Sequence, residues 1–112
     1  MQIRFANTKL RRLCEDEQAM RRKLGDRQAR LLMRRLMEFR AAVTLSDIGR
    51  LPGARCHQLT GDRRGQLTVD LVYPDRLVFV PDHDPIPTKP DGGMDWSKVT
   101  AVLVIQIADT HS

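Results

Sequence analysis

Histidine and arginine are the residue types through which this chain could move protons and hold anions. A histidine titrates near neutral pH, so it can donate or accept a proton, and an arginine can bind two oxygens of one phosphate through its planar fork. His57 lies in a predicted strand, Arg63 and Arg64 lie in the loop that follows, Arg76 opens another strand, and His111 is the penultimate residue. The second half of the chain therefore contains groups for proton transfer and for phosphate binding.

The sequence offers little for metal or cysteine chemistry. No comparable set of carboxylates is present to hold Mg²⁺, and Cys14 and Cys56 do not have the spacing of metal ligands. We expect no metal and no cofactor, and we interpret both cysteines as small buried residues that stay reduced. Tyr73 and Trp96 are interpreted as packing residues and His83 as a surface residue, because no motif includes them.

The positive charge is concentrated in the first half of the chain. The protein has 112 residues, which predicts one domain over 1–112, and it has 19 Lys and Arg against 14 Asp and Glu. Residues 1–55 hold fourteen basic and six acidic side chains, a net charge of +8, whereas the remainder has −3. This asymmetry indicates a polyanionic or acidic protein partner, and the alternative is that the basic helix faces are simply solvated.

Two targeting features are missing from the sequence. No apolar stretch approaches the roughly 20 residues that span a bilayer, and the N-terminal segment lacks the pattern of a secretory signal. We therefore expect a cytoplasmic protein without a membrane partner.

The first half of the sequence predicts a strand and two helices. Ile3 and Phe5 alternate with polar residues, as in a short strand. A first helix, ended by Gly25, and a second helix, capped by Asp26 and reaching Val43, follow from apolar residues at helical spacing. The short connection between them predicts an antiparallel pair. The apolar positions are Leu10, Leu13, Cys14, Met20 and Leu24, then Ala29, Leu32, Met33, Leu36, Phe39 and Val43.

The second half of the sequence predicts four strands, at 56–60, 66–72, 76–80 and 99–108. The last of these is apolar on both faces, which is typical of a strand in a sheet that is covered on both sides. The segment between Pro81 and Trp96 is rich in proline and glycine and predicts no helix or central strand. The order β-α-α-β-β-β-β indicates an α+β fold, with two antiparallel helices on one face of a curved, mainly antiparallel sheet of about five strands.

Three short motifs are spread along the second half of the chain. Their residues are His57, Leu59, Gly61, Asp62, Arg63 and Gly65, then Arg76, Leu77 and Phe79, then Asp109 and His111. Together with the order of the elements, they resemble over nearly the whole chain the HigB-type killer toxins of the RelE/ParE superfamily, which carry a Pro-Gly turn followed by His-x-Leu-x-Gly-Asp-Arg-x-Gly, then Arg-Leu-x-Phe, and a terminal Asp-Tyr-His. Two features differ, because Thr110 replaces the family tyrosine and segment 82–98 resembles an insertion.

The resemblance implies a toxin of a type II toxin-antitoxin system that cleaves mRNA on the ribosome. Such an mRNA interferase uses the 2′-hydroxyl of the RNA as nucleophile, contacts rRNA, and is neutralised by a cognate helix-turn-helix antitoxin. In this reading His57 and His111 transfer protons, Arg76 and Arg63 hold the scissile phosphate, and Arg64 contacts RNA. Asp109 would orient His111 or a neighbouring arginine.

Two other functions remain open from the sequence. One is inhibition of DNA gyrase by a ParE-like protein without a nuclease site, and the other is a nucleic-acid-binding module without toxicity. Thr110 leaves room for both, because threonine cannot replace a tyrosine that stacks on a base or moves a proton. His57 could be a solvent-facing strand residue, and Arg76 could only balance the charge of Asp70 and Asp75. The presence of both histidines favours the nuclease, since a gyrase inhibitor has no chemical need for them.

Overall fold

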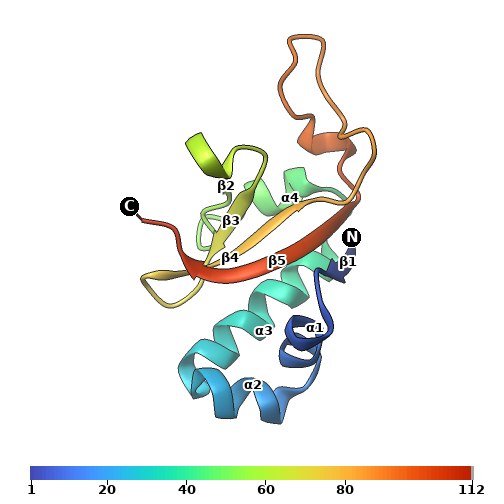
Figure 1. Cartoon of the computed structure of the whole chain (residues 1–112). Helices are drawn as coiled ribbons and strands as arrows, with labels where there is room; N and C mark the ends of the chain where they lie inside the picture. The colour runs from blue at the N-terminus through green and yellow to red at the C-terminus, as the bar shows by residue number, and fades with distance from the viewer. Residues whose placement is uncertain (112) are drawn as a thin grey trace.

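A short strand and a series of helices make up the first half of the chain (Figure 1). The computed structural model describes residues 1–111. Strand β1 covers Gln2–Phe5 and is followed by helices α1 (Thr8–Glu15), α2 (Glu17–Leu24) and α3 (Asp26–Ala41). The N-cap of α1 is Asn7, whose side chain accepts a hydrogen bond from the Leu10 amide at 2.8 Å. The cap thereby satisfies one of the amide groups that have no partner within the first turn of α1.

The prediction of a single first helix that Gly25 ends is wrong, because α1 and α2 are separate helices. Asp16 lies between them with extended backbone angles, φ −113° and ψ 106°. Its carboxylate accepts hydrogen bonds from the amides of Gln18 and Ala19, at 3.0 and 3.2 Å, and so caps α2. An N-cap requires non-helical backbone, which breaks the helix although the apolar spacing continues across the break. Asp26 is also not the cap of α3, since it is the first helical residue and Gly25 precedes it with φ 80°.

A fourth helix, α4 (Leu45–Gly49), was not predicted from the sequence. It starts at a capping box in which Thr44 and Asp47 bond reciprocally to backbone amides. Leu45 and Ile48 bury its apolar side in the core. Val43, expected on the apolar face of α3, lies beyond the end of that helix and is 75% exposed.

The second half of the chain completes a five-stranded sheet. Its strands are β2 (His57–Gln58), β3 (Leu67–Asp70), β4 (Asp75–Pro81) and β5 (Ala101–Asp109), with short 3-10 helices at Gly61–Arg63 and Trp96–Lys98. The strand order is β1-β5-β4-β3-β2, in which β1 and β5 are parallel and all other neighbours are antiparallel. The predicted α+β class and a mainly antiparallel sheet of five strands are confirmed.

The core lies between the helices and one face of the sheet (Figure 1). Phe39 of α3 meets Phe79 of β4 edge to face, with ring centroids 5.0 Å apart and planes at 72°. Around this pair are buried Leu32 and Leu36 of α3 and Leu77 of β4, each at most 1% exposed. The periodic apolar face of α3 therefore sets the position of the helices on the sheet.

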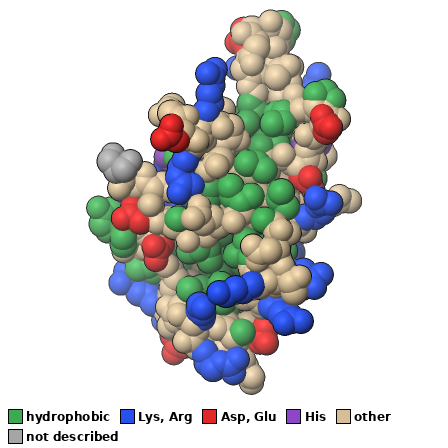
Figure 2. Space-filling model, in the orientation of Figure 1, with side chains coloured by type: hydrophobic (Ala, Val, Ile, Leu, Met, Phe, Trp, Pro, Cys, Tyr) green, Lys and Arg blue, Asp and Glu red, His purple; other side chains and the backbone are tan. Residues whose placement is uncertain are grey.

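The other face of the sheet, called the open face below, is only partly covered, contrary to the expectation for β5, and Thr68 of β3 and Val78 of β4 are buried on it. Val102 and Val104 are buried against the helices, but Ala101, Leu103 and Ile105 alternate with them and stay partly exposed. Figure 2 shows hydrophobic atoms as a band across the face that carries β5. Apolar residues on both faces of a strand therefore did not mean that helices cover both faces.

Segment 82–95 projects beyond the sheet as a long hairpin (Figure 1). A bridge pairs Thr88 with Met94, and the Lys89 amide donates to the Gly93 carbonyl at 2.7 Å. Trp96, at its base, packs against the core, as expected for a packing residue, and its indole N–H donates to Gln58 at 3.3 Å. Within residues 1–111, no helix has the length and apolar character needed to cross a membrane.

The aromatic pair provides a test of this packing. Replacing Phe39 with Ala should lower the free energy of unfolding by about 3–5 kcal/mol, because the surrounding side chains cannot fill the cavity. Met37→Ala on the same helix is the matched control, since Met37 is 66% exposed and should change stability by less than about 0.5 kcal/mol. Denaturant unfolding followed by circular dichroism measures both. Equal losses in the two variants would contradict the described position of α3.

Candidate functional site

The strand register brings residues from four strands into two rows on the open face. His57 is paired with Thr68, Thr68 with Val78, and Val78 with Gln106. In the next row Asp70 is paired with Arg76, and Arg76 with Ala108. Paired residues project from the same face of a sheet, so the predicted site residues His57 and Arg76 lie on one surface.

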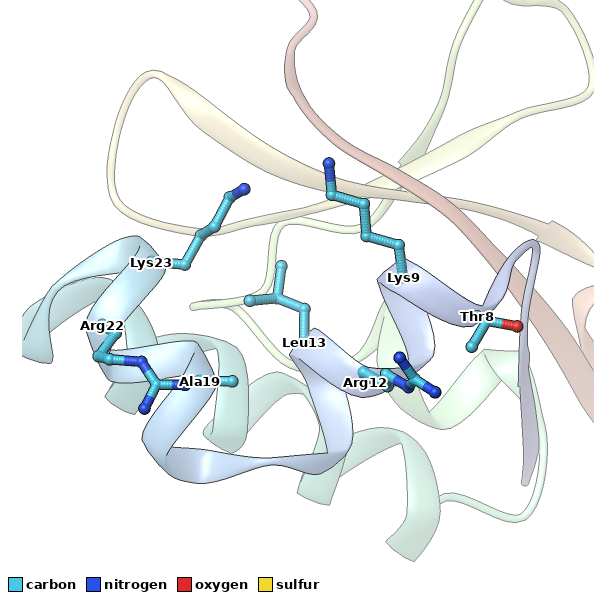
Figure 3. Close-up of a pocket in the computed structure, with 7 residues that line it drawn as sticks. All are labelled: Thr8, Lys9, Arg12, Leu13, Ala19, Arg22 and Lys23. Carbon is cyan, nitrogen blue, oxygen red and sulfur yellow. The ribbon is translucent and has the colours of Figure 1, made fainter.

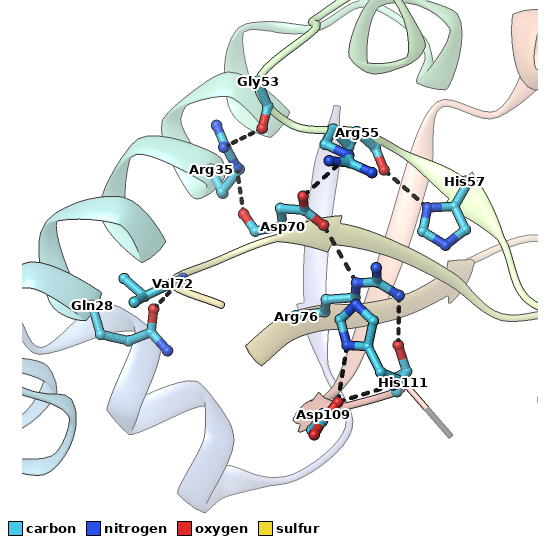
Figure 4. Close-up of polar contacts among 11 residues, drawn as sticks. Gln28, Arg35, Gly53, Arg55, His57, Asp70, Val72, Arg76, Asp109 and His111 are labelled. Carbon is cyan, nitrogen blue, oxygen red and sulfur yellow. Dashed lines mark hydrogen bonds and ion pairs between the residues drawn. The ribbon is translucent and has the colours of Figure 1, made fainter. Parts of the chain in front are cut away.

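Arg76 lies at the centre of the polar contacts on this face (Figure 4). Its side chain is 13% exposed, and Nη1 donates to the Thr110 hydroxyl at 3.0 Å. Nε lies 3.4 Å from Oδ1 of Asp70, and the other Asp70 oxygen lies 3.5 Å from Nε of Arg55. The Arg76 guanidinium is thus positioned by neighbours on two strands, and its Nη2 group has no protein partner within residues 1–111.

Unsatisfied polar atoms are concentrated in the same rows. Among the described residues, three buried side-chain atoms lack a hydrogen-bond partner: the Thr68 hydroxyl, Oδ1 of Asp70 and Nε of Arg76. Asp70 and Arg76 are close enough to attract each other but are not aligned for a hydrogen bond. Native proteins leave few such groups unsatisfied, so their clustering marks these rows as a candidate functional region.

His111 is held against Asp109 at the end of β5 (Figure 4). One Asp109 oxygen accepts from the His111 amide at 2.9 Å and lies 3.0 Å from the ring nitrogen Nδ1. The His111 amide, then its ring, and then the charge of Arg76 lower the pKa of Asp109 below its ordinary value. Asp109 is therefore ionised at neutral pH, and Nδ1 of His111 faces a carboxylate while Nε2 is left for other partners.

The ring of Tyr73 lies beside His111, with ring centroids 5.1 Å apart. The expectation that Tyr73 packs in the core is wrong, because its side chain is 79% exposed. It lies in the turn between β3 and β4, which carries the ring to the rim of the site. An exposed aromatic ring at this position provides a surface on which a base can stack.

His57 lies on the same face but does not touch His111. Its Nδ1 is 3.0 Å from the Arg55 carbonyl, which can only accept, so Nδ1 carries the proton and Nε2 is free. A hollow of about 130 Å³ is lined by Arg55, Asp70, Leu71, Tyr73, Asp75, Arg76 and His111, without His57. The structure therefore brings His111 and Arg76 together and places His57 at the edge, on β2.

Arg63 and Arg64 have different environments, although they are neighbours in the sequence. Nη1 of Arg63 donates to the amide oxygens of Gln66 and Gln106, at 3.0 and 3.1 Å. Arg63 also lines a hollow of about 530 Å³ together with Asp109 and Thr110. Arg64 is exposed and makes no ion pair with the described residues. Arg63 thus belongs to the open face, whereas Arg64 is a free surface cation beside it.

Two buried polar residues of α3, Gln28 and Arg35, support the site from below and were not identified from the sequence. Gln28 accepts from the Val72 amide at 2.7 Å and donates to Asp75 at 3.0 Å. Arg35, only 5% exposed, donates to the carbonyls of Asp70 and Gly53, at 2.8 and 2.7 Å. Its Nη1 donates to Glu38 at 2.9 Å. The sequence does contain a pattern that could have identified them, because Gln28 and Arg35 are polar residues seven positions apart within the apolar face of α3.

The described residues offer no obvious metal site. Among residues 1–111, no group of three or more His, Cys, Asp or Glu side chains is placed to hold a metal ion. The site is also not strongly basic, since Asp70 and Asp75 balance the charges of Arg55 and Arg76 in the small hollow. Its affinity for an anion therefore depends on the guanidinium nitrogens of Arg55 and Arg76 that Asp70 does not contact.

Arg35 and Arg34 allow a matched test of the support beneath the site. Arg35→Ala should lower the free energy of unfolding by about 3 kcal/mol or more, because it leaves two carbonyls without their donor and removes the closer of two arginines from part-buried Glu38. Arg34 binds the same Glu38 at 3.5 Å but is 72% exposed, so Arg34→Ala should cost less than about 1 kcal/mol. Chemical denaturation measures both values. Similar values would show that Arg35 is not a structural centre.

Both cysteines should be unreactive in the folded protein. Burial is the main cause that raises the pKa of Cys14 to about 11 and the sole cause that raises that of Cys56 to about 12. Because only the thiolate is alkylated, iodoacetamide at pH 8 should react at least roughly 100-fold more slowly with the native than with the urea-unfolded chain. Mass spectrometry of the labelled peptides reports each rate. Labelling of either cysteine at the unfolded rate would contradict its described environment.

Comparison with known proteins does not identify the function of this site. No protein family model and no curated protein matches the sequence of the chain. The resemblance to the RelE/ParE superfamily therefore stays a prediction, and the function has to be argued from residues at the site.

Proposed function

We propose that this protein is an RNA endonuclease whose site is the open face of the sheet. The observation that carries the proposal is the cluster around Arg76, where unsatisfied buried polar atoms adjoin Thr110, the Asp109–His111 pair and an exposed tyrosine. An RNA segment has a chemical group for each of these residues. Its phosphate would bind the guanidinium group of Arg76, its 2′-hydroxyl has a proton to transfer, and a base could stack on the tyrosine ring.

The hydrogen bonds of the two histidines suggest different roles. His57 donates through Nδ1 to a carbonyl, so in its neutral form Nε2 has a free lone pair and can act as general base. The protonated ring of His111 forms an ion pair with Asp109 and presents Nε2–H as general acid. Asp109 fixes the ring orientation, and Arg76 with Arg63 would hold the phosphate.

The proposed reaction is a transesterification within the RNA. The 2′-oxygen loses its proton to His57 and attacks phosphorus, forming an O2′–P bond while the bond from phosphorus to O5′ breaks. His111 gives its proton to the leaving O5′, and the guanidinium of Arg76 neutralises the charge that develops on the phosphate oxygens. The products are a 2′,3′-cyclic phosphate and a 5′-hydroxyl.

The wider role follows from the sequence resemblance and belongs to the same proposal. The chain would act in the cytoplasm as a toxin that cleaves mRNA on the ribosome, with Arg64 contacting RNA or rRNA. A cognate antitoxin with a helix-turn-helix domain would neutralise it. An adjacent short gene that encodes such a protein would support this role.

The histidine pair provides the first test of the nuclease. His57→Ala and His111→Ala should each lower the cleavage rate by about 10²- to 10⁴-fold, the usual effect of losing a positioned proton-transfer group. Affinity for RNA should stay near that of the unmutated protein. Arg76→Ala should lower both rate and affinity, and Arg76→Lys should restore only part, because lysine lacks the planar fork. Mapped cleavage of translated mRNA and filter binding of RNA are the measurements.

His83→Ala is the matched control for the histidine variants, because His83 contacts the Thr100 amide outside the site. It should cleave at the unmutated rate. If His57→Ala and His111→Ala both fold and remain fully active, the proposed reaction centre is wrong. Growth arrest with intact mRNA and stalled replication would instead indicate a gyrase inhibitor.

Thr110→Tyr tests how the site differs from the family pattern. Thr110 accepts a hydrogen bond from Arg76, so a tyrosine at this position would keep a hydroxyl near the guanidinium and add a ring for stacking. We expect the variant to cleave faster than the unmutated protein, as measured by initial rates on the same mRNA. An unchanged rate would show that the two histidines and Arg76 suffice without the ring.

A further inference from the structure

A basic groove with an apolar floor runs between α1 and α2, away from the candidate site (Figure 3). It encloses about 560 Å³ and is lined by Thr8, Lys9, Arg12, Leu13, Ala19, Arg22 and Lys23. In Figure 3 Leu13 points up between Lys9 on one side and Lys23 on the other. The break at Asp16 creates this groove, because it lets α2 turn away from α1 instead of continuing in line.

The groove continues from the helices to the sheet. A second hollow of about 510 Å³ shares Lys9, Leu13 and Lys23 with the first, and its other side is formed by Ile105, Gln106 and Ile107 of β5. Strand β1 pairs with β5 only as far as Val104, so this part of β5 has no strand partner on that side. The two hollows together offer apolar side chains and an open strand edge to a chain laid along them.

The charged residues that line the hollow between α1 and α2 are all basic, and Asp75, which accepts from Gln28, is the one acidic residue that lines the second hollow among residues 1–111. Lys9, Arg12, Arg22 and Lys23 are exposed, and none of them forms an ion pair with the described residues. By contrast, the neighbouring Arg21 on α2 is paired with both Glu17 and Asp26, at 2.9 and 3.2 Å. Four unpaired cations around leucine and isoleucine side chains favour a ligand that is both acidic and apolar.

We propose that this groove binds an acidic, amphipathic segment of a partner protein. Apolar side chains of that segment would contact Leu13, Ile105 and Ile107, while Asp or Glu side chains on its flanks meet Lys9 and Lys23. A nucleic acid fits less well, because its outward-facing phosphates would leave the apolar floor uncovered. Only the biological role of this partner, as an antitoxin that neutralises the protein, rests on the proposed function; the binding itself does not.

Selection from a random peptide library displayed on yeast, with the purified full chain as target, tests the proposal. We expect the selected peptides to combine Leu, Ile, Val or Phe with Asp or Glu. Changing both Lys9→Glu and Lys23→Glu should weaken their binding by about tenfold or more, since two charged contacts become repulsive. Replacing the acidic residues of a selected peptide with Lys should restore binding to this double variant.

The matched control is the double change Arg27→Glu and Arg30→Glu on α3. These two arginines are exposed, line neither hollow and give the same change in net charge. Peptide binding should be unaffected in this control. The proposal is overturned if the peptides bind both double variants equally, or if selection yields no acidic apolar peptides.

Binding of a single-stranded RNA probe shows whether the groove binds RNA instead of a protein segment. If the double change at Lys9 and Lys23 weakens RNA binding far more than the control does, and no peptide is selected, the groove is an RNA surface and the proposal is wrong. RNA cleavage by the same variants is measured separately. Because neither lysine belongs to the proposed reaction centre, loss of peptide binding with cleavage unchanged supports the groove independently of the nuclease.

Discussion

The buried guanidinium of Arg35 is the contact on which the geometry of the open face depends. Arg35 lies on the buried side of α3 and donates to the carbonyls of Gly53, before β2, and Asp70, at the end of β3. These two segments are therefore fixed relative to α3. Asp70 in turn faces both Arg55 and Arg76. A buried charge without these acceptors would be strongly unfavourable, which makes the arrangement specific.

Placing the helices on one side of the sheet leaves the other side available for ligands. The open face collects side chains from β2, β3, β4 and the end of β5, and only the strand register brings them together. The break between α1 and α2 has a second effect, because it forms a basic groove on the opposite side of β5 from β4. One small fold thus separates the polar surface that we propose as the nuclease site from the mixed surface that we propose as a groove for a protein segment.

Patterns with a single physical cause were the predictable part of this structure. The apolar face of α3 reports burial directly, and the alternating apolar residues of β3 and β4 lie in the core, so the α+β class and most elements follow from the sequence. The split at Asp16 and the short helix α4 were missed because each depends on a side-chain cap rather than on periodicity. The partners of Gln28 and Arg35, the exposure of Tyr73 and the separation of the two histidines depend on tertiary contacts.

The chemistry of the cleaved ends tests the central claim most directly. An mRNA translated in a purified system should be cut by the protein to leave a 2′,3′-cyclic phosphate and a 5′-hydroxyl, because the attacking group is the 2′-oxygen of the substrate. Replacing the 2′-hydroxyl at the mapped position with a 2′-O-methyl group should abolish cleavage there and leave the other positions intact. Ends with a 3′-hydroxyl and a 5′-phosphate, or undiminished cutting at the methylated position, would contradict the proposed reaction.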